Sequence, residues 1–353
     1  MTAPAFDARR RQLAIALGGG AMGLGRHASS APRQSSAYWN RPLVREFAQA
    51  TSERFGLPPG WVESAIRSGR PNAAAARWMA TASSTGAEDW LRYRRSQIDA
   101  HRLARGLSFW WKYQDTLERA RDEFGPAPEI VVAIIGVESQ YGRMTGRFRI
   151  LDVLLTLAFD VPRRAAEYRE ELAQFLMLSR EQNVEASSCL GSIAGAIGLP
   201  QFLPSSIRRY AIDFDADGRI DLAHSPLDAI GSVAHFLLQH GWRAELPVMF
   251  AAPAAGDAAP ALDDGPTRWS SLAALGLGSD LELSPDETVR VFGLNYLDDQ
   301  GQAQRDPRIG TANFEALLGY NRSNLYAATV AELAVELRRR FDADIAQPGS
   351  ASG

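Results

Sequence analysis

Cysteine is nearly absent from this chain, which has Cys189 as its only thiol in 353 residues. A single cysteine excludes an intramolecular disulfide framework and a thiolate zinc site. We interpret Cys189 as a small buried residue or as an exposed residue without a function.

Neither sign of charge dominates, because 38 basic residues and 41 acidic residues leave a net charge of −3. No overall field then draws the chain to nucleic acid or anionic lipid, and we expect no nucleic acid partner.

The N-terminal apolar stretch is too short to be a confident membrane-spanning helix. Arg9, Arg10 and Arg11 precede apolar residues 13–17 and a glycine-rich run to Leu24. Basic residues, a short apolar stretch and small residues near 28–31 form the pattern of an export signal. The arginines favour the twin-arginine route, and no cysteine follows the run for lipid attachment. We therefore expect a periplasmic protein. A disordered arm or an uncleaved anchor is the alternative interpretation of residues 1–35.

The rest of the composition is that of a globular protein, 46% hydrophobic and 22% charged, and the length predicts about two domains. From Tyr38 to Phe124 apolar residues recur at helical spacing, with a break at Pro58–Gly60, and Leu43, Val44 and Phe47 form one expected face. Further helices are predicted over 129–141, 150–159, 163–182, 205–211, 226–240 and 314–341. Residues 288–294 alternate like a strand, which predicts a small hairpin or sheet.

Glu138 is the first candidate for chemistry. It ends a run of apolar residues, Ile130 to Val137, that is hydrophobic on every side and therefore predicts a buried helix. Gly142 is placed to end that helix. A carboxylate is costly to bury in its ionised form, and desolvation raises its pKa into the range of a general acid. The alternative is an acid that reaches solvent at the helix end, or one held by a structural partner.

A second candidate segment, Gly191 to Ser206, is rich in small residues that let backbones approach closely. Its Ser192 and Gln201 offer polar contacts to a sugar. The alternative is a tight helix-packing segment. A third candidate, Asp213 to Asp221, has the front half of an EF-hand calcium loop, but His224 stands where the closing glutamate belongs. An acidic turn capping the next helix is the alternative there.

Together these segments resemble the goose-type-lysozyme-like core of lytic transglycosylases. Glu138-Ser139 and the pattern Gly-Ala-x-Gly-x-x-Gln-Phe-x-Pro-Ser carry the resemblance. The finer similarity is to the membrane-bound lytic transglycosylase B family and its soluble relatives. It is strong over residues 105–245 and ends at Gly319–Ser323. Its other marks are Arg149–Asp152, Leu157–Phe159, Pro162–Arg164, Asp228–Ala234 and His240–Trp242.

The resemblance implies a mainly α (α+β) fold, with a lysozyme-like helical catalytic core, a flanking helical domain and a small β hairpin or sheet insertion. The implied parts are a signal peptide and linker (1–35), a helical domain (36–125), the catalytic core (126–245), a loop-rich β insertion (246–312), a C-terminal helix completing the core (313–345) and a disordered tail (346–353).

The implied reaction is cleavage of the β-1,4 bond between N-acetylmuramic acid and N-acetylglucosamine in peptidoglycan, with formation of 1,6-anhydromuramyl ends. One carboxyl group, Glu138, would serve as acid and then as base, and the substrate acetamido group would stabilise the intermediate. The implied substrate-binding residues are Ser192, Gln201, Phe202, Phe236, Tyr320 and Asn321. His235-Phe236 stands where the family has Asn-Tyr, so the ring is kept and a hydroxyl is lost.

The family has a longer variant of the calcium loop, closed by a later acid that matches Asp228. The implied metal ligands are Asp213, Asp215, Asp217, Arg219 and Asp228, for a structural Ca²⁺ that the chemistry does not require. Expected partners are peptidoglycan strands and cell-wall synthesis proteins, and we expect a monomer. Two other functions stay open, namely a hydrolytic muramidase on the same fold and a non-catalytic peptidoglycan-binding scaffold.

Overall fold

The computed structural model describes residues 38–81, 89–252, 265–274 and 283–346, which form two compact units. The Glu138 unit comprises the described residues within 85–144 and 210–353. The Ser192 unit comprises those within 14–84 and 145–209. The predicted signal peptide (1–35), most of the loop expected over 251–266, and the tail from 347 lie outside the described residues.

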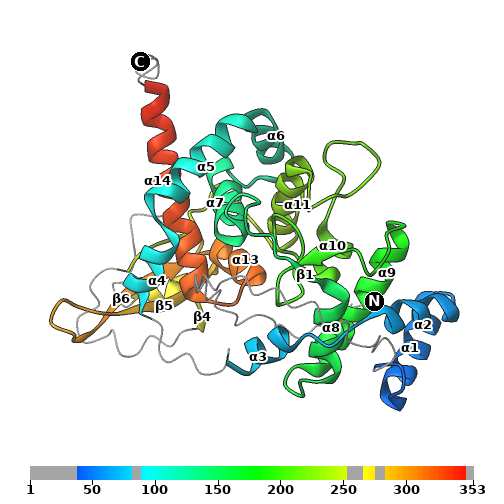
Figure 1. Ribbon diagram of the computed structural model, residues 1–353. Coiled ribbons are helices and arrows are strands. Elements are labelled where there is room, and N and C mark those ends of the chain that lie inside the picture. The colour runs from blue at the N-terminus through cyan, green and yellow to red at the C-terminus, as the bar shows by residue number, and fades with distance from the viewer. Residues whose placement is uncertain (1–37, 82–88, 253–264, 275–282, 347–353) are drawn as a thin grey trace, which may run out of the picture. The chain divides into compact units, whose positions relative to one another are not determined.

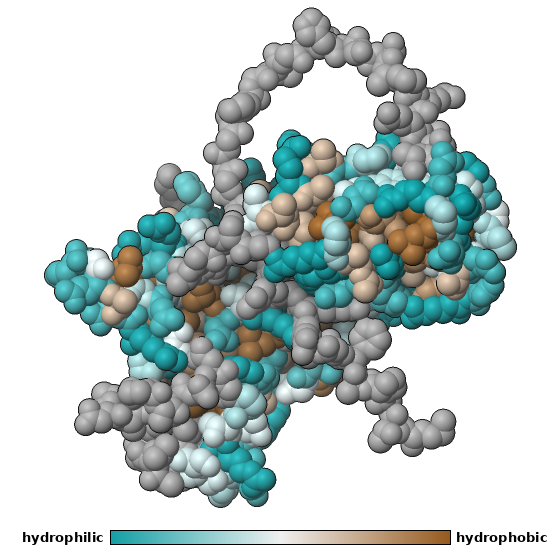
Figure 2. Space-filling view, turned by 90° about the horizontal axis from the view of Figure 1, so that it is seen from below, coloured by the Kyte–Doolittle hydropathy of each residue, from teal (hydrophilic) through white to brown (hydrophobic). Residues whose placement is uncertain are grey.

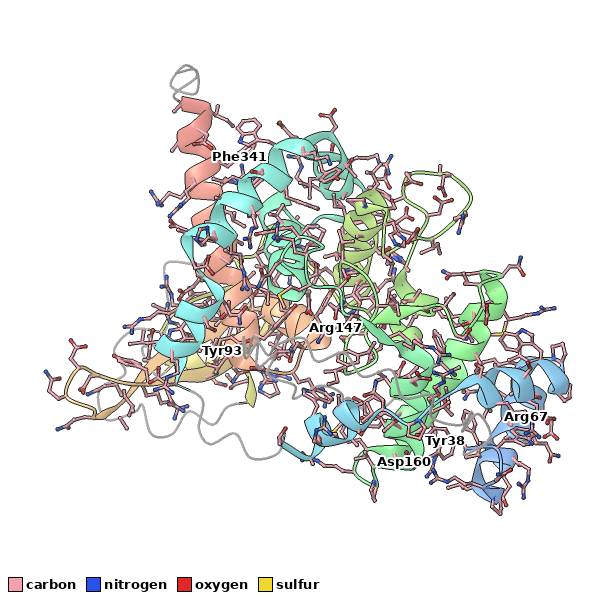
Figure 3. All side chains as sticks on the ribbon, viewed as in Figure 1. Tyr38, Arg67, Tyr93, Arg147, Asp160 and Phe341 are labelled. Atoms are coloured by element: carbon pink, nitrogen blue, oxygen red, sulfur yellow. The ribbon has the colours of Figure 1, made fainter. Side chains whose placement is uncertain are left out.

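The Ser192 unit is helical, with one short pair of strands. Its helices are α1 (Pro42–Phe55), α2 (Pro59–Ser68), α3 (Ala73–Thr81), α8 (Ile150–Phe159), α9 (Ala165–Glu181) and α10 (Pro204–Tyr210), whose last residue, Tyr210, already belongs to the Glu138 unit. The strand β1 (Phe148–Arg149) pairs with β2 (Leu190–Gly191). Every residue of α8 is buried, and α9, α3 and β1 pack around it. Tyr38 and Arg41 bind the end of α8, since the Tyr38 hydroxyl donates to Asp160 at 2.6 Å (Figure 3).

The Glu138 unit is built around a central helix, α7 (Pro128–Ser139). Figure 1 shows the other long helices of this unit around it: α5 (Ala100–Lys112), α6 (Gln114–Phe124), α11 (Pro226–Gln239) and α14 (Asn324–Ala346). The shorter α4 (Trp90–Gln97) and α13 (Ala312–Tyr320) pack on α14. Because α7 is apolar on all sides, it is stable only when enclosed by other helices in this way.

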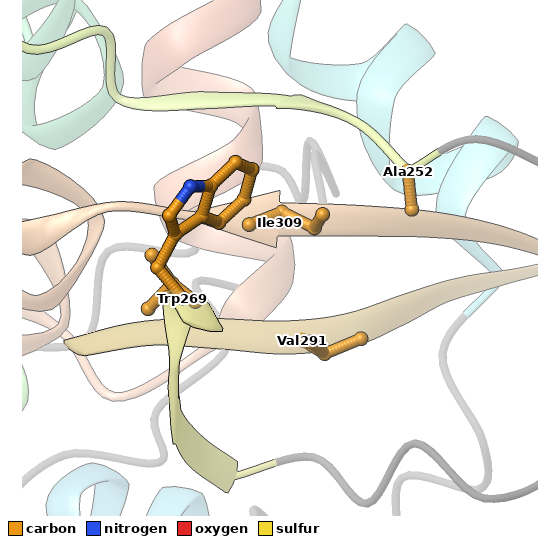
Figure 4. Packing of buried hydrophobic residues seen from close by; sticks show 5 residues of the cluster. Ala252, Trp269, Val291 and Ile309 are labelled. Carbon is orange, nitrogen blue, oxygen red and sulfur yellow. The ribbon is translucent and has the colours of Figure 1, made fainter. Parts of the chain in front are cut away.

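A four-stranded antiparallel sheet belongs to the same unit, in the order β3-β6-β5-β4. The strands are β3 (Met249–Ala251), β4 (Gly265–Arg268), β5 (Thr288–Leu297) and β6 (Ala303–Gly310), and α12 (Trp269–Ala274) follows β4. β5 and β6 form a hairpin closed by the Asp298 amide donating to the Gln302 carbonyl. Trp269, Val289, Val291, Ile309 and Ala252 form a buried cluster on the sheet (Figure 4).

The expected mainly α fold with a small sheet is confirmed. The predicted helices at 150–159 and 226–240 match α8 and α11 to within a residue. One predicted helix, 314–341, is wrong, because the chain is extended at Asn321 and two helices, α13 and α14, take its place. Leu43 also does not share the buried face of Val44, since it is 44% exposed. α7 ends at Ser139 and is capped by the left-handed Gln140, two residues before the expected Gly142.

On the face drawn in Figure 2, hydrophobic residues lie in separate patches among hydrophilic ones. Among the described residues, no helix combines the length and the apolar character needed to cross a membrane. α14, the longest of the described helices, carries several charged residues, including Arg338, Arg339 and Arg340.

Candidate active site

Glu138 occupies the last turn of α7, as the sequence predicts. Of the twelve residues in this helix, only its two acids, Glu129 and Glu138, escape full burial. Glu129 forms an ion pair with Arg338, with 2.7 Å between its Oε2 atom and the Arg338 Nη2 atom. Glu138 is half-buried and has a different kind of partner. The helix therefore places one carboxyl group at the edge of an apolar core.

The partner of Glu138 is Tyr326, near the start of α14. Its hydroxyl donates a hydrogen bond to Glu138 Oε1 at 2.8 Å, across 188 residues of chain. Tyr326 has no exposed surface, and its burial, together with the charge of Glu138, raises the pKa of this phenol well above its usual range. Tyr326 is thus a neutral donor throughout the working pH range of ordinary enzymes. Sequence analysis missed it, because the pattern of α14 alone does not distinguish it from other core aromatics.

An aromatic cluster continues from Tyr326 through the same unit. The Tyr320 ring stacks on Tyr326 with centroids 6.2 Å apart, and Phe236 meets Tyr320 edge-on at 4.8 Å. His240 stacks on Phe236 at 3.9 Å, with Tyr210 edge-on to Phe236. Tyr320 is fully buried and Phe236 is 3% exposed. These enclosed rings pack against Tyr326, which in turn holds Glu138. The sugar contacts predicted for Tyr320 and Phe236 stay predictions.

Asn321 follows Tyr320 at the break between α13 and α14. It is 8% exposed, and no hydrogen-bond partner for its buried Oδ1 lies among the described residues. Native proteins seldom leave a buried side-chain acceptor unsatisfied. This acceptor is therefore suited to a donor from a ligand, such as a sugar hydroxyl.

Ser192 lies in the other unit, in a tight turn after β2. Its hydroxyl accepts hydrogen bonds from the amides of Ala196 at 3.0 Å and Ala194 at 3.3 Å, and the side chain is half-buried. Gly146, with φ of 95°, lies so close to Gly191 that a side chain there would overlap its carbonyl group. Gly191, which lies in the segment predicted to permit close backbone approach, is itself so near the Ala196 carbonyl that a side chain there would overlap it.

Gln201 and Phe202 complete that turn. Gln201 adopts a left-handed backbone (φ 50°), and its amide nitrogen donates to the carbonyls of Gly198 at 2.8 Å and Thr145 at 3.1 Å. Phe202 is fully buried and bridges to Ile197. Phe202 packs inside the turn and Gln201 shapes it, and the predicted sugar contacts of both residues stay predictions.

The acidic loop after Tyr210 brings three of its predicted ligands together. One oxygen from each of Asp213, Asp215 and Asp217 lies within 4.8 Å of the others. The loop turns sharply at Ala216 and Gly218, both left-handed, and the Gly218 amide donates to Asp213 at 2.8 Å. Three carboxylates in such a loop form a hard-oxygen donor set that fits Ca²⁺.

Asp228 has a different environment at the start of α11. It is 1% exposed, and its oxygens accept hydrogen bonds from the amides of Phe214 and Asp221, each at 2.8 Å. Burial raises the pKa of this carboxyl group. Asp228 thereby pins both ends of the acidic loop to α11, and it is not one of the three clustered acids. Its role as a metal ligand stays a prediction.

Arg119 attaches the same loop to α6. Its guanidinium lies 3.6 Å from the centre of the Phe214 ring and donates to the Phe214 carbonyl. Sequence analysis did not identify this arginine, because its partner is 95 residues away. The acidic loop is therefore a braced element of the Glu138 unit, separate from the Tyr326–Glu138 pair.

The arrangement around Glu138 is suited to moving one proton in two directions. Because Oε1 already accepts from Tyr326, a proton on this carboxyl group is favoured on Oε2. The ionised form keeps the Tyr326 hydrogen bond after the proton has left. A single carboxyl group of this kind can act first as a general acid and then as a general base.

Comparison with known proteins bears on the same residues. Residues 40–335 match the family described as Transglycosylase SLT domain. The chain is 42% identical over 257 residues to membrane-bound lytic murein transglycosylase B of Escherichia coli (strain K12), an alignment that covers 71% of this chain and 68% of that protein.

Two solved structures share the fold. The soluble lytic transglycosylase SltB1 from Pseudomonas aeruginosa matches with a TM-score of 0.78 at 38% identity, covering 85% of this chain and 99% of that one. The Escherichia coli lytic transglycosylase Slt35 in complex with calcium matches with a TM-score of 0.76 at 34% identity, covering 89% and 100%.

Proposed function

The chain belongs to the transglycosylase SLT family and is a lytic transglycosylase of peptidoglycan, and from this premise we propose that Glu138 is the only acid and base of its reaction. The observation that carries this proposal is the hydrogen bond from the buried Tyr326 hydroxyl to Glu138 Oε1. This hydrogen bond holds the Glu138 carboxyl group in place through a neutral donor. An acid on an ordinary protein surface pairs instead with a lysine or arginine.

In the first proposed step, Glu138 protonates the glycosidic oxygen as the bond from this oxygen to the muramyl C1 breaks. The substrate acetamido group stabilises the positive charge at C1. In the second step the muramyl C6 hydroxyl attacks C1, and its proton returns to Glu138. One bond breaks and one forms, no water is consumed, and the product is a 1,6-anhydro end. The enzyme needs no second carboxylate, because the returning proton restores the first one.

We propose Ser192 and Asn321 as sugar contacts. The Ser192 hydroxyl already accepts two amide hydrogen bonds, so its own proton is available to donate. Asn321 supplies an acceptor that is unsatisfied within the described residues. Gln201 shapes the turn that carries Ser192, while Tyr320 and Phe236 support Tyr326.

For the acidic loop we propose a structural Ca²⁺ held by Asp213, Asp215 and Asp217. The relative Slt35 was solved in complex with calcium. In EF-hand loops a backbone carbonyl supplies the seventh position, which here is Arg219. Asp228 completes the site through Oδ2, which accepts one hydrogen bond, from the Asp221 amide, and keeps a second lone pair, whereas Oδ1 accepts from the amides of both Phe214 and Asp215. The cation would hold the loop and take no part in the reaction.

We further propose that the protein acts on glycan strands in the periplasm, after export by the signal at its N-terminus. The matching Escherichia coli protein is named membrane-bound. The chain would work as a monomer, and wall-synthesis proteins are its proposed partners.

Product analysis tests the proposed reaction. Purified sacculi are digested with the wild-type protein and with Glu138→Gln, and soluble muropeptides are identified by mass spectrometry. We expect 1,6-anhydromuramyl products from the wild type and none from the variant. Reducing muramyl ends would identify a hydrolytic muramidase. Sacculus binding without any product from the wild type would identify a non-catalytic scaffold.

A further inference from the structure

The turn that follows Glu138 folds back onto its own helix. Gln140 and Tyr141 are both left-handed, with φ of 50° and 59°, although neither is glycine. The Gln140 amide donates to the carbonyl of Gly136 at 3.1 Å, and the Tyr141 amide donates to that of Ile135 at 3.4 Å. Such backbone conformations are unfavourable for residues with side chains and persist only where the surroundings enforce them.

The side chain of Tyr141 occupies the space of two missing side chains. A Cβ atom on Gly136 of α7 or on Gly106 of α5 would lie within 3.0 Å of the Tyr141 hydroxyl, closer than real Cβ atoms approach. The Phe109 ring of α5 lies 5.6 Å from the Tyr141 ring. We call the space provided by Gly106 and Gly136 the glycine slot. The ring of Tyr141 fills it between α5 and α7.

Packing, rather than hydrogen bonding, holds Tyr141 in the slot. Its hydroxyl is buried and has no hydrogen-bond partner among the described residues. Burial also raises the pKa of this phenol, so it stays neutral at physiological pH. A hydroxyl without a partner contributes little, so the contact that matters is the fit of the ring against two glycines.

We propose that Tyr141, seated in the glycine slot, is a positioning residue that fixes the place of the Glu138 carboxyl group. Gly136 lies two residues before Glu138 and Tyr141 three residues after it, so the slot clamps the chain on both sides of the acid. Withdrawing the ring frees the last turn of α7, and with it the alignment of Glu138 on Tyr326. This proposal rests on the proposed acid–base role of Glu138.

Two substitutions of Tyr141 separate the ring from its hydroxyl. Tyr141→Phe keeps the ring, and we expect kcat within about twofold of the wild type, because the lost hydroxyl has no partner. Tyr141→Leu empties the outer part of the slot. We expect kcat to fall about 10- to 100-fold, with KM within about threefold, because a small displacement of a catalytic group lowers the rate steeply. Thermal melts identify the folded fraction of each variant.

A matched control separates positioning from stability. Gly69→Ala, in the Ser192 unit, would bring a Cβ against the Leu155 side chain, as Gly136→Ala would against Tyr141. We expect Gly69→Ala to lower the melting temperature and leave kcat per folded molecule unchanged. Gly136→Ala should lower kcat about as much as Tyr141→Leu does.

The double variant Gly136→Ala/Tyr141→Leu tests the fit directly. Leucine lacks the outer ring atoms that the new methyl group meets, so the double variant should lose less kcat than the product of the two single losses. A folded Tyr141→Leu with wild-type kcat would overturn the proposal, as would multiplicative losses. If Gly136→Ala fails to fold, the proposal is tested by the kcat values of Tyr141→Phe and Tyr141→Leu alone. Wild-type turnover by Glu138→Gln would instead reject the acid–base role.

Discussion

Glu138 and the acidic loop 213–221 belong to the same unit, yet their carboxylates meet different surroundings. Glu138 lies at the end of a buried helix and accepts a hydrogen bond from a neutral phenol. In the loop, Asp213, Asp215 and Asp217 lie together on one turn, where the first two are half-buried and Asp217 is exposed. A proton-transfer group must exchange a proton near neutral pH, which apolar surroundings favour, whereas a cation site needs several ionised oxygens. The surroundings of each carboxylate therefore decide whether it is suited to proton transfer or to binding a cation.

The largest expected effect is that of Glu138→Gln. The amide has the shape of the acid but cannot give or take the proton, so kcat should fall at least about 1000-fold, within the range of general acid–base contributions. Release of anhydro-muropeptides from sacculi measures it. Asp217→Asn is the matched control from the acidic loop and should keep most of the activity of the folded protein. Equal losses in the two variants would erase the proposed difference between the sites.

Tyr326→Phe should have the next largest effect. The variant keeps the buried ring and removes the hydrogen bond to Glu138 Oε1, so we expect kcat to fall about 10- to 100-fold. Because the pKa of Tyr326 is raised well above 10, the wild type should show no loss of activity from its ionisation below that pH. Initial rates across pH 5 to 9 check both points. A Phe variant with wild-type kcat would leave Glu138 without its proposed support.

Calcium removal should change stability more than chemistry. A ligand that binds only the folded protein stabilises it, so millimolar Ca²⁺ should raise the melting temperature by several degrees over a chelated sample. In Asp217→Asn this shift should shrink or vanish. Differential scanning fluorimetry gives the shift, with Mg²⁺ as the comparison ion. An identical melting temperature with calcium and with chelator would contradict a stabilising cation.

The smallest expected effect concerns a third kind of acid, Glu336. Arg339 and Arg340 lower its pKa to about 2. A lowered pKa stabilises the fold above the ordinary value near 4.5, and this contribution is lost as pH falls towards 2. Because the pair is solvent-screened, Glu336→Gln should cost only about 0.5–1 kcal/mol at pH 7 and less at pH 3.5. Urea unfolding at both pH values checks the sign. A larger loss at the lower pH would contradict it.

The sequence predicted the features that depend on local pattern. The apolar residues of α7 indicated a buried helix with Glu138 at its end, and alternation indicated the strand β5. The break at Asn321 escaped prediction because the glycine next to it, Gly319, lies within the last turn of α13 and does not mark where the helix ends. A capping signal was present, since the Ser323 hydroxyl accepts from the Tyr326 amide at 3.3 Å, but serine is also common inside helices.

Partners far apart in the chain were beyond sequence reasoning. Nothing near Tyr326 indicates Glu138, and nothing near Gly106 indicates Tyr141, because only the packing of α5, α7 and α14 brings them together. The same holds for Asp228, whose carboxylate holds the loop amides of Phe214 and Asp221. The family resemblance implied a role for Asp228 but for neither Tyr326 nor Tyr141, and their contacts come from the structure alone.

Isotope labelling of the products tests the central claim, that the muramyl C6 hydroxyl, and not water, attacks C1 and returns the proton to Glu138. Sacculi are digested by the wild-type protein in H₂¹⁸O, and the muropeptides are analysed by mass spectrometry. The account predicts 1,6-anhydromuramyl ends with no ¹⁸O at C1, because the C6 hydroxyl of the substrate is the nucleophile. Reducing muramyl ends that carry ¹⁸O would show that water attacks C1, and would contradict the account.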